Sequence, residues 1–282
     1  MSVVLAVLVL TLVLLIALAV RQSVPTETDV AWLAGPNFSH TGTTQNDDAL
    51  AVCRQYLTRH RRHRLTGGLI GVLFAAIIGV RWFESITIGM GQGSPLADLL
   101  FCGVSGVIVG TLSAESFRLA TAPDAKRAAS LTPRQAPAGS KRVAISRAIA
   151  GTAVVVGAIA AIADHGWLAL ITSLILVAPL AVSELVMMVI ASRGRPAMTD
   201  RARHLDARLR RFAGSSLSYL HLATALLMLG WTLSKIDALS GPLAFARFCV
   251  VIGCLVTTMV MLHRAAPRPS ARILFEDRAP VT

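Results

Sequence analysis

The sequence predicts an all-α integral membrane protein, a polytopic transmembrane helical bundle with about seven spans. Of its 282 residues, 54% are hydrophobic and only 15% are charged, whereas an ordinary soluble protein carries about 25% charged residues. The apolar residues also gather into runs close to about 20 residues, the length that crosses about 30 Å of hydrocarbon as a helix. This composition excludes a soluble globular protein, and it excludes a disordered chain, which would be poor in apolar residues.

Seven apolar runs qualify, or nearly qualify, as spans. The first contains no charge, and no basic residue precedes it as one would in a signal peptide, so we expect a retained helix. A cleaved signal peptide is the alternative, because Ala17-Leu18-Ala19 has the form of a cleavage site. The fourth run requires Arg147 to extend towards the headgroups. The runs are Ser2–Val20, Leu65–Val80, Leu96–Ser113, Val143–Ala163, Trp167–Ala191, Ser215–Ser234 and Pro242–Leu262.

The basic residues predict the orientation. With the N-terminus outside and the C-terminus cytoplasmic, 24 of the 27 Lys and Arg residues lie on the inner side, and only Arg81, Lys235 and Arg247 do not. This is the bias that the positive-inside rule requires. Tryptophans favour the headgroup level, and three fall at the outer ends of spans: Trp82, Trp167 and Trp231. We therefore expect a multi-pass protein of the cell membrane, and the Ala-, Arg- and Val-rich composition suggests a bacterial source.

Membrane and cytoplasmic segments are predicted to alternate along the chain. After the first helix (1–20), the helix pairs two–three, four–five and six–seven occupy residues 65–113, 143–191 and 215–262. The cytoplasmic segments are 21–64 with a basic juxtamembrane helix, the flexible linker 114–142, the basic amphipathic segment 192–214, and the tail 263–282.

The first cytoplasmic segment is the most structured of the four. Residues 22–43 are rich in Pro, Thr, Gly and Asn and are expected to form a loop with a helical turn around Val30–Leu33. Thr44 and Asp47 then have the pattern of a helix start. The three- and four-residue spacing of the apolar positions that follow predicts a helix over Asp47–Arg64, which runs on towards the second span.

The segment 192–214 has an amphipathic pattern. Thr199 can cap a helix in which Leu205, Leu209 and Phe212 share one face. Two interpretations stay open: a helix that lies on the inner leaflet, and a plain extension of the sixth span.

Two groups of arginines border the membrane, and the chain has a net charge of +12. Basic residues next to a transmembrane helix typically contact anionic lipid headgroups, so we expect the anionic inner leaflet as partner and no nucleic acid. The membrane-surface basic cluster is Arg59, Arg61, Arg62, Arg64, Arg208, Arg210 and Arg211.

Glu184 and His221 are the leading candidates for chemistry, because an ionisable group in hydrocarbon costs about 2.5–3.5 kcal/mol on insertion scales. They lie on the fifth and sixth spans, at about 10 Å and about 9 Å from the inner ends at about 1.5 Å per residue. Because these spans are antiparallel, we expect a Glu184–His221 contact. It could relay protons or coordinate a substrate, or it could be a structural contact. Alternatively, Glu184 simply pairs with Arg147.

Two further features have structural interpretations. Asp98 and Arg247 share a shallow outer depth on spans three and seven, which predicts an interhelical ion pair. Gly103-Val104-Ser105-Gly106 is similar to the Gly-x-Ser-Gly nucleophile motif of rhomboid intramembrane proteases, but the histidine and asparagine pattern of that family is absent. We therefore expect small residues for close helix packing, continued by Gly106-x-x-x-Gly110.

No catalytic constellation, metal-ligand spacing or cofactor motif is recognised, so neither an enzyme nor a cofactor is expected. The favoured hypothesis is a non-enzymatic accessory or regulatory component, which acts through an unidentified membrane or cytoplasmic protein partner in the bilayer or at its cytoplasmic face. The alternative is a small transporter or channel with Glu184 and His221 in a proton or substrate path.

Overall fold

The structure, a computed structural model, is all-helical over the residues that it describes. The all-α prediction is thus confirmed for this part of the chain. The first predicted span, Ser2–Val20, lies outside it. The described residues are 24–35, 44–82, 95–116, 140–163, 167–192, 200–236 and 241–266.

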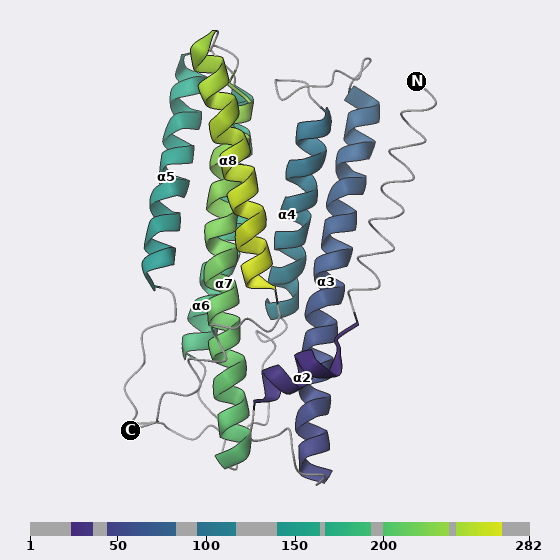
Figure 1. Cartoon of the computed structure of the whole chain (residues 1–282). Helices are drawn as coiled ribbons and strands as arrows, with labels where there is room; N and C mark the ends of the chain where they lie inside the picture. Colours follow the sequence, from purple (N-terminus) through teal and green to yellow (C-terminus); the bar gives the residue numbers. More distant parts are fainter. Residues whose placement is uncertain are drawn as a thin grey trace.

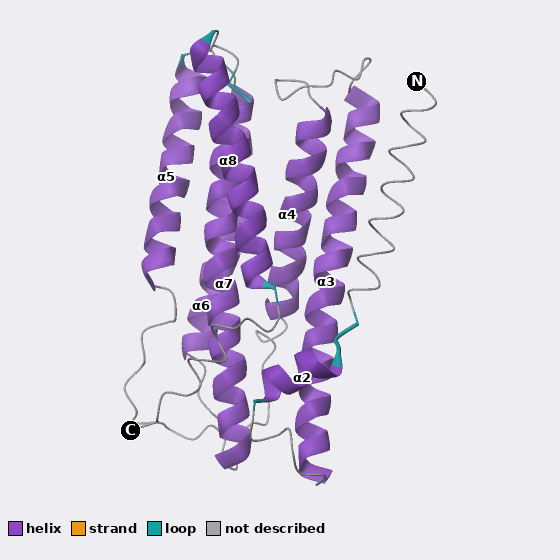
Figure 2. Ribbon diagram, in the orientation of Figure 1, coloured by secondary structure: helices purple, strands orange, loops and turns teal. Residues whose placement is uncertain are grey.

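The helices form two groups joined along one side (Figure 1). The long helix α3 packs against α4 as an antiparallel hairpin, and α5, α6 and α8 surround α7. The hairpin meets this bundle where α4 packs on α6 and α7. Figure 2 shows the short helix α2 lying across α3 and beside α7, both of which extend beyond it. The bounds are α2 Glu27–Ala34, α3 Thr44–Trp82, α4 Pro95–Ser116, α5 Ser140–Ile162, α6 Trp167–Ser192, α7 Asp200–Ser234 and α8 Pro242–Ala265.

Four of these helices are long and apolar enough to cross a membrane: Lys141–Ile162, Trp167–Ala191, His204–Ser234 and Pro242–Ala265. The apolar part of α4, Leu99–Glu115, is shorter. Within the four, 61% of the apolar window of α7 is buried inside the protein, against 22% in each of the other three. The helix α7 is therefore the centre of the bundle, and the others present most of their apolar surface outward.

That outward surface has the character of a lipid-facing one. Large apolar side chains are exposed along the peripheral helices, which would be unfavourable in water. Examples are Val155, Ile159, Leu174, Leu185, Phe245 and Val256, each more than two-fifths exposed. A helix that is apolar on both its inner and outer sides is stable when hydrocarbon replaces water around it.

Glycines bring α3 and α4 into direct backbone contact. A Cβ atom added to Gly67 would lie 2.2 Å from the carbonyl oxygen of Gly106, and one added to Gly106 would lie 2.2 Å from that of Gly67. Gly71 and Gly110 are equally tight against the opposite helix. The expected packing role of Gly106-x-x-x-Gly110 is what the structure shows, with Gly67-x-x-x-Gly71 as its counterpart on α3.

The helix α2 is longer than the turn expected around Val30–Leu33. It begins with a capping box, in which the hydroxyl of Thr26 accepts from the N–H of Asp29 and the Asp29 carboxylate accepts from the N–H of Thr26. It ends at Gly35, whose φ of 96° lies in the region that favours glycine. The spacing Thr26-x-x-Asp29 was thus a readable helix start.

The segment 192–214 contains the start of the long helix α7, which runs unbroken from Asp200 to Ser234. Of the two interpretations, the structure shows the extension of the sixth span. The apolar face of Leu205, Leu209 and Phe212 packs on α2 and α3. This face is covered by the protein itself, because α2 occupies the place that a lipid surface would take.

We call the unit built around α2 the basal unit, comprising residues 24–35, 44–64 and 204–213. Its apolar core is separate from that of the transmembrane helices. The buried members are Val30, Trp32, Leu33, Ala34, Cys53, Tyr56, Leu57 and Leu205.

Candidate functional site

The expected contact between α6 and α7 is present in a polar cluster. Oε1 of Glu184 lies 2.8 Å from Nε of Arg147 on α5 and 3.4 Å from Nε2 of His221 on α7. The structure therefore brings Glu184 next to both residues that the sequence proposed for it. The arginine is the stronger partner, because 3.4 Å is too long for a good hydrogen bond.

Burial differs sharply across this cluster. The His221 side chain is 1% exposed, that of Glu184 is 30% exposed, and that of Arg147 is 64% exposed. Arg147 thus extends from the surface of α5 to meet Glu184. In a membrane the ion pair lets the two charges neutralise each other, while the carboxylate stays partly covered.

Ser183 fixes the orientation of the His221 ring. Its Oγ lies 2.6 Å from Nδ1 of His221 and also donates to the carbonyl of Leu180 at 2.7 Å. Pro179 precedes this turn, and α6 nevertheless continues through it. The second ring nitrogen of His221 faces only Glu184 among the described residues.

A second arginine completes the polar side of α5. Nη1 of Arg142 donates to Oγ of Ser218 at 3.1 Å, and its guanidinium lies 4.1 Å from the ring centroid of Tyr219. Both contacts tie the start of α5 to α7. They satisfy a charged group near the polar end of the helix bundle.

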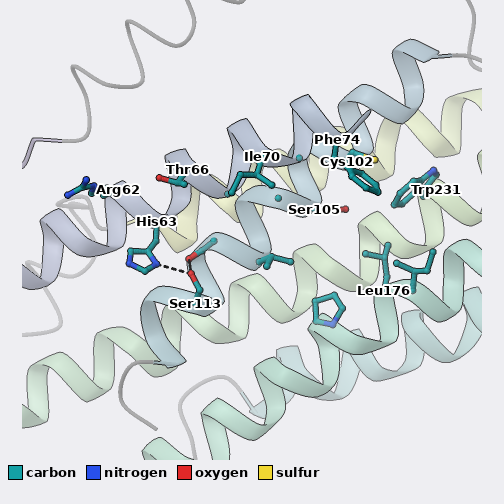
Figure 3. Close-up of a pocket in the computed structure, with 17 residues that line it drawn as sticks. Arg62, His63, Thr66, Ile70, Phe74, Cys102, Ser105, Ser113, Leu176 and Trp231 are labelled. Carbon is teal, nitrogen blue, oxygen red and sulfur yellow. Dashed lines mark hydrogen bonds between the residues drawn. The ribbon is translucent and has the colours of Figure 1, made fainter. Parts of the chain in front are cut away.

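The cluster stands apart from a cavity that the described residues form. This cavity, of about 590 Å³, lies between the α3–α4 hairpin and the bundle and is lined by residues of α3, α4, α6 and α7 (Figure 3). Neither Glu184 nor His221 is among its lining residues. Neither side chain therefore opens into this cavity, although Glu184 is 30% exposed elsewhere on the bundle.

A buried carboxylate that sequence reasoning did not single out lies at the end of α4. Glu115 is 0% exposed and accepts a hydrogen bond from the hydroxyl of Tyr56 on α3. Nε2 of His60, one helical turn further along α3, lies 3.4 Å from the same carboxylate oxygen. The ring of Phe212 on α7 closes the cluster against Tyr56 and His60.

This cluster disfavours the charged form of His60. Burial of the ring lowers the pKa of His60 below its usual 6.5, because water no longer stabilises the imidazolium, and the nearby Arg64 and Arg59 act in the same direction. The Glu115 carboxylate raises the pKa in opposition, but the net direction is downward. Glu115 was missed because it lies just beyond the third predicted span, Leu96–Ser113, in the predicted linker 114–142, where a charged residue is ordinary; α4 instead continues to Ser116. The predicted residue ranges of the helices did not show that α3 packs against Glu115.

The chain matches no family model, and no curated protein or solved structure is detectably similar to it. The site must therefore be judged from its own geometry. Among the described residues, no group of three or more His, Cys, Asp or Glu side chains is arranged to hold a metal ion.

The membrane-surface basic cluster divides by environment. Arg61, Arg64, Arg208 and Arg210 are held by ion pairs or hydrogen bonds to the protein. Arg61 forms an ion pair with Asp29 at 2.6 Å, and Arg210 forms one with Asp206 at 2.7 Å. Arg64 donates to the carbonyl of Leu262 at 3.0 Å, and Arg208 to that of Trp32 at 2.8 Å.

The remaining three arginines of the cluster are Arg59, Arg62 and Arg211. The guanidinium of Arg59 lies 5.9 Å from the ring centroid of Tyr56, whereas Arg62 and Arg211 are exposed.

The expected outer ion pair joins Asp98 and Arg247. The side chain of Asp98 lies outside the described part of the structure, and Arg247 is half-buried on α8. Their pairing stays a prediction from the sequence.

Proposed function

We propose that this protein is a non-enzymatic accessory or regulatory component of the cell membrane that acts through a protein partner at the cytoplasmic face. One observation carries the proposal. Arg147, Glu184 and His221 contact one another and do not line the cavity, whereas a folded basal unit extends beyond the apolar helices. The part of the molecule that is built to contact something else is therefore the basal unit.

The topology belongs to the same proposal. We take the chain as seven spans with the N-terminus outside, a count that adds Ser2–Val20, the apolar part of α3 and α4 to the four long helices. The basal unit is then cytoplasmic, in agreement with the charge bias along the sequence. Single cysteine substitutions test this topology directly, by reaction with a labelling reagent. Thr28→Cys should react with a membrane-impermeant reagent only after cell lysis, and Ala163→Cys should react in intact cells. The reverse pattern would invert the topology and place the basal unit outside.

The contacts of α2 provide a test of the partner. Arg208 donates to the carbonyls of Trp32 and Leu33, the last groups of α2. Arg208→Gln removes the charge and most of these donors, while Arg211→Gln changes an exposed arginine one turn away. Each full-length variant is purified from its native host in mild detergent, and retained proteins are quantified by mass spectrometry.

A stoichiometric partner that the wild type and Arg211→Gln retain, and that Arg208→Gln loses, is the expected result. A single clean species from the wild type would contradict the accessory role. A partner that all three proteins retain equally would place its binding surface outside the basal unit.

Proton or substrate transport is the second candidate, and one observation favours it. Oε1 of Glu184 is within reach of both Arg147 and His221, so a change of charge on any one of them acts on the other two. Glu184→Gln tests it. Under the accessory proposal, this variant keeps its protein partner and is only slightly less stable. Loss of proton-coupled uptake in the folded variant would instead establish transport.

A further inference from the structure

The cavity between the hairpin and the bundle has the dimensions of a lipid site. Its volume of about 590 Å³ falls within the range of about 300–1,000 Å³ that is usual for small-molecule sites. Its α3 side runs from Arg62 to Phe74, a rise of twelve residues that spans about 18 Å of helix. Half the hydrocarbon core of a bilayer is about 15 Å thick. The groove is therefore long enough to hold an acyl chain from the headgroup level to the bilayer centre.

The two ends of the cavity differ in chemistry (Figure 3). Arg62, His63 and Ser113 gather at one end, and Phe74 and Trp231 lie at the other. Between them the walls are mostly apolar, with Ile70, Val109, Ile175 and Leu176, although Thr66 and Ser105 also line the cavity, and the packed glycines belong to the same lining. The polar end is the one nearer the basal unit, where headgroups are expected.

The polar end is arranged to receive an anion. Ser113 donates to the carbonyl of Gly110 at 2.8 Å, and its Oγ lies 2.8 Å from Nδ1 of His63, which holds the imidazole at the mouth of the cavity. Arg62 is exposed beside it and forms no hydrogen bond or ion pair within the described part of the chain. In contrast, the neighbouring Arg61 and Arg64 are already engaged by Asp29 and by the carbonyl of Leu262.

We infer that this cavity binds one anionic phospholipid, with an acyl chain along the groove and its phosphate at Arg62, beside His63. The inference is independent of the proposed partner. An arginine that approaches phosphate makes charge-assisted, often bidentate hydrogen bonds, and the apolar walls match a hydrocarbon chain. The net negative charge of the lipid complements the polar end, which carries no acidic side chain among its lining residues.

Full-length protein in detergent is incubated with phosphatidylglycerol or with phosphatidylcholine of the same acyl chains, and retained lipid is counted by native mass spectrometry. One phosphatidylglycerol per chain is expected, with about tenfold weaker retention of phosphatidylcholine, the size of one charged hydrogen bond. Arg62→Gln should lower phosphatidylglycerol retention by about tenfold, and Arg211→Gln should leave it unchanged. Equal retention by both variants would show unspecific lipid and overturn the site.

Filling the groove tests the acyl chain separately. Val109 is 54% exposed and lines the cavity, and Val155 is 57% exposed on α5 away from it. Val109→Trp should abolish retention while the melting temperature stays that of Val155→Trp, which keeps the lipid. Retention by both tryptophan variants contradicts the groove. Stabilisation by inorganic phosphate as large as that by the lipid would reduce the site to an anion site and overturn the acyl assignment.

The alternative occupant of the groove is an apolar segment of this chain itself. A photo-crosslinking amino acid at position 109 of the purified full-length protein distinguishes the two. An adduct with the mass of a phospholipid is expected. A crosslink to the peptide of residues 2–20 in place of the lipid adduct would overturn the proposal.

Discussion

The hydroxyl of Tyr56 donates a hydrogen bond to the carboxylate of Glu115, 59 residues away in the sequence, where α3 and α4 meet α7. Tyr56 is 6% exposed and Glu115 is 0% exposed. A buried carboxylate is costly unless it is hydrogen-bonded, so this contact couples the basal unit to the end of the α3–α4 hairpin. It defines a joint between the two parts of the molecule.

Tyr56→Phe should destabilise the protein by about 1–3 kcal/mol, because the ring stays and a buried carboxylate loses a donor. Thermal or denaturant unfolding in detergent measures this. The matched control is Tyr219→Phe, which removes a hydroxyl from a half-buried ring on α7 and keeps the contact of that ring with Arg142. Equal stability of the two variants would contradict a role for the Tyr56 hydroxyl.

The neutral state of His60 predicts a pH dependence of stability. Its pKa is lowered from 6.5 in the folded protein, so the unfolded chain binds a proton first as the pH falls below about 6.5. The contribution of His60 is therefore complete above this pH and decreases below it. Between pH 7.5 and pH 5.5, the melting temperature of the wild type should fall further than that of His60→Gln. In His204→Gln, which changes an exposed histidine on α7, the fall should match the wild type; the same fall in His60→Gln would refute the prediction.

Gly67→Ala should separate α3 from α4. The new methyl group would lie 2.2 Å from the carbonyl oxygen of Gly106, so the helix backbones must move apart, at a cost of about 1–3 kcal/mol or more. Gly253→Ala on α8 is the control, since nothing lies within 4 Å of its added methyl group. Helix propensity alone makes that change neutral or stabilising. The unfolding transitions of the Gly67→Ala and Gly253→Ala variants are compared. Equal stability of the two variants would contradict tight packing of α3 on α4.

The C-terminus of α2 should open when Arg208 is replaced. Its guanidinium donates to two carbonyls that the helix leaves unpaired, and its charge is favourable at the negative end of the helix dipole. Arg208→Gln should accelerate hydrogen–deuterium exchange in residues 26–35 by about tenfold, which corresponds to about 1.4 kcal/mol of local stability. Exchange in α7 beyond residue 215 should stay unchanged, as should α2 in Arg211→Gln. Slow exchange of α2 in Arg208→Gln would show that its apolar face alone holds it.

The meeting of Glu184 and His221 could be anticipated because it depends on local properties. Both residues lie at similar depth on consecutive antiparallel spans, so their approach follows from helix rise and connectivity. The Tyr56–Glu115 contact had no such signal. It requires that α3 extends without a break from the basal unit to α4, and that the glycines bring the two backbones into contact. The spacing predicted that the helix runs on towards the second span, but apolar periodicity does not show which helix the glycines of α4 contact.

The basic residues show the same difference between what the sequence predicts and what the packing of the helices decides. Their distribution along the chain predicts which side of the membrane they occupy, since that depends only on counts between spans. Whether each arginine faces lipid or protein depends on what packs beside it. Arg61 and Arg208 hold α2, whereas Arg62, one residue after Arg61, is rotated by about 100° around the helix and lies at the cavity.

The sequence by itself determined the helical class and the positions of the apolar helices, because burial in hydrocarbon requires only length and composition. Tertiary structure alone decided which polar groups are paired, which apolar face of α7 is covered, and where the cavity opens. These depend on contacts between residues far apart in the chain, such as Arg64 with Leu262 and Tyr56 with Glu115. Such contacts arise only when all the helices pack together.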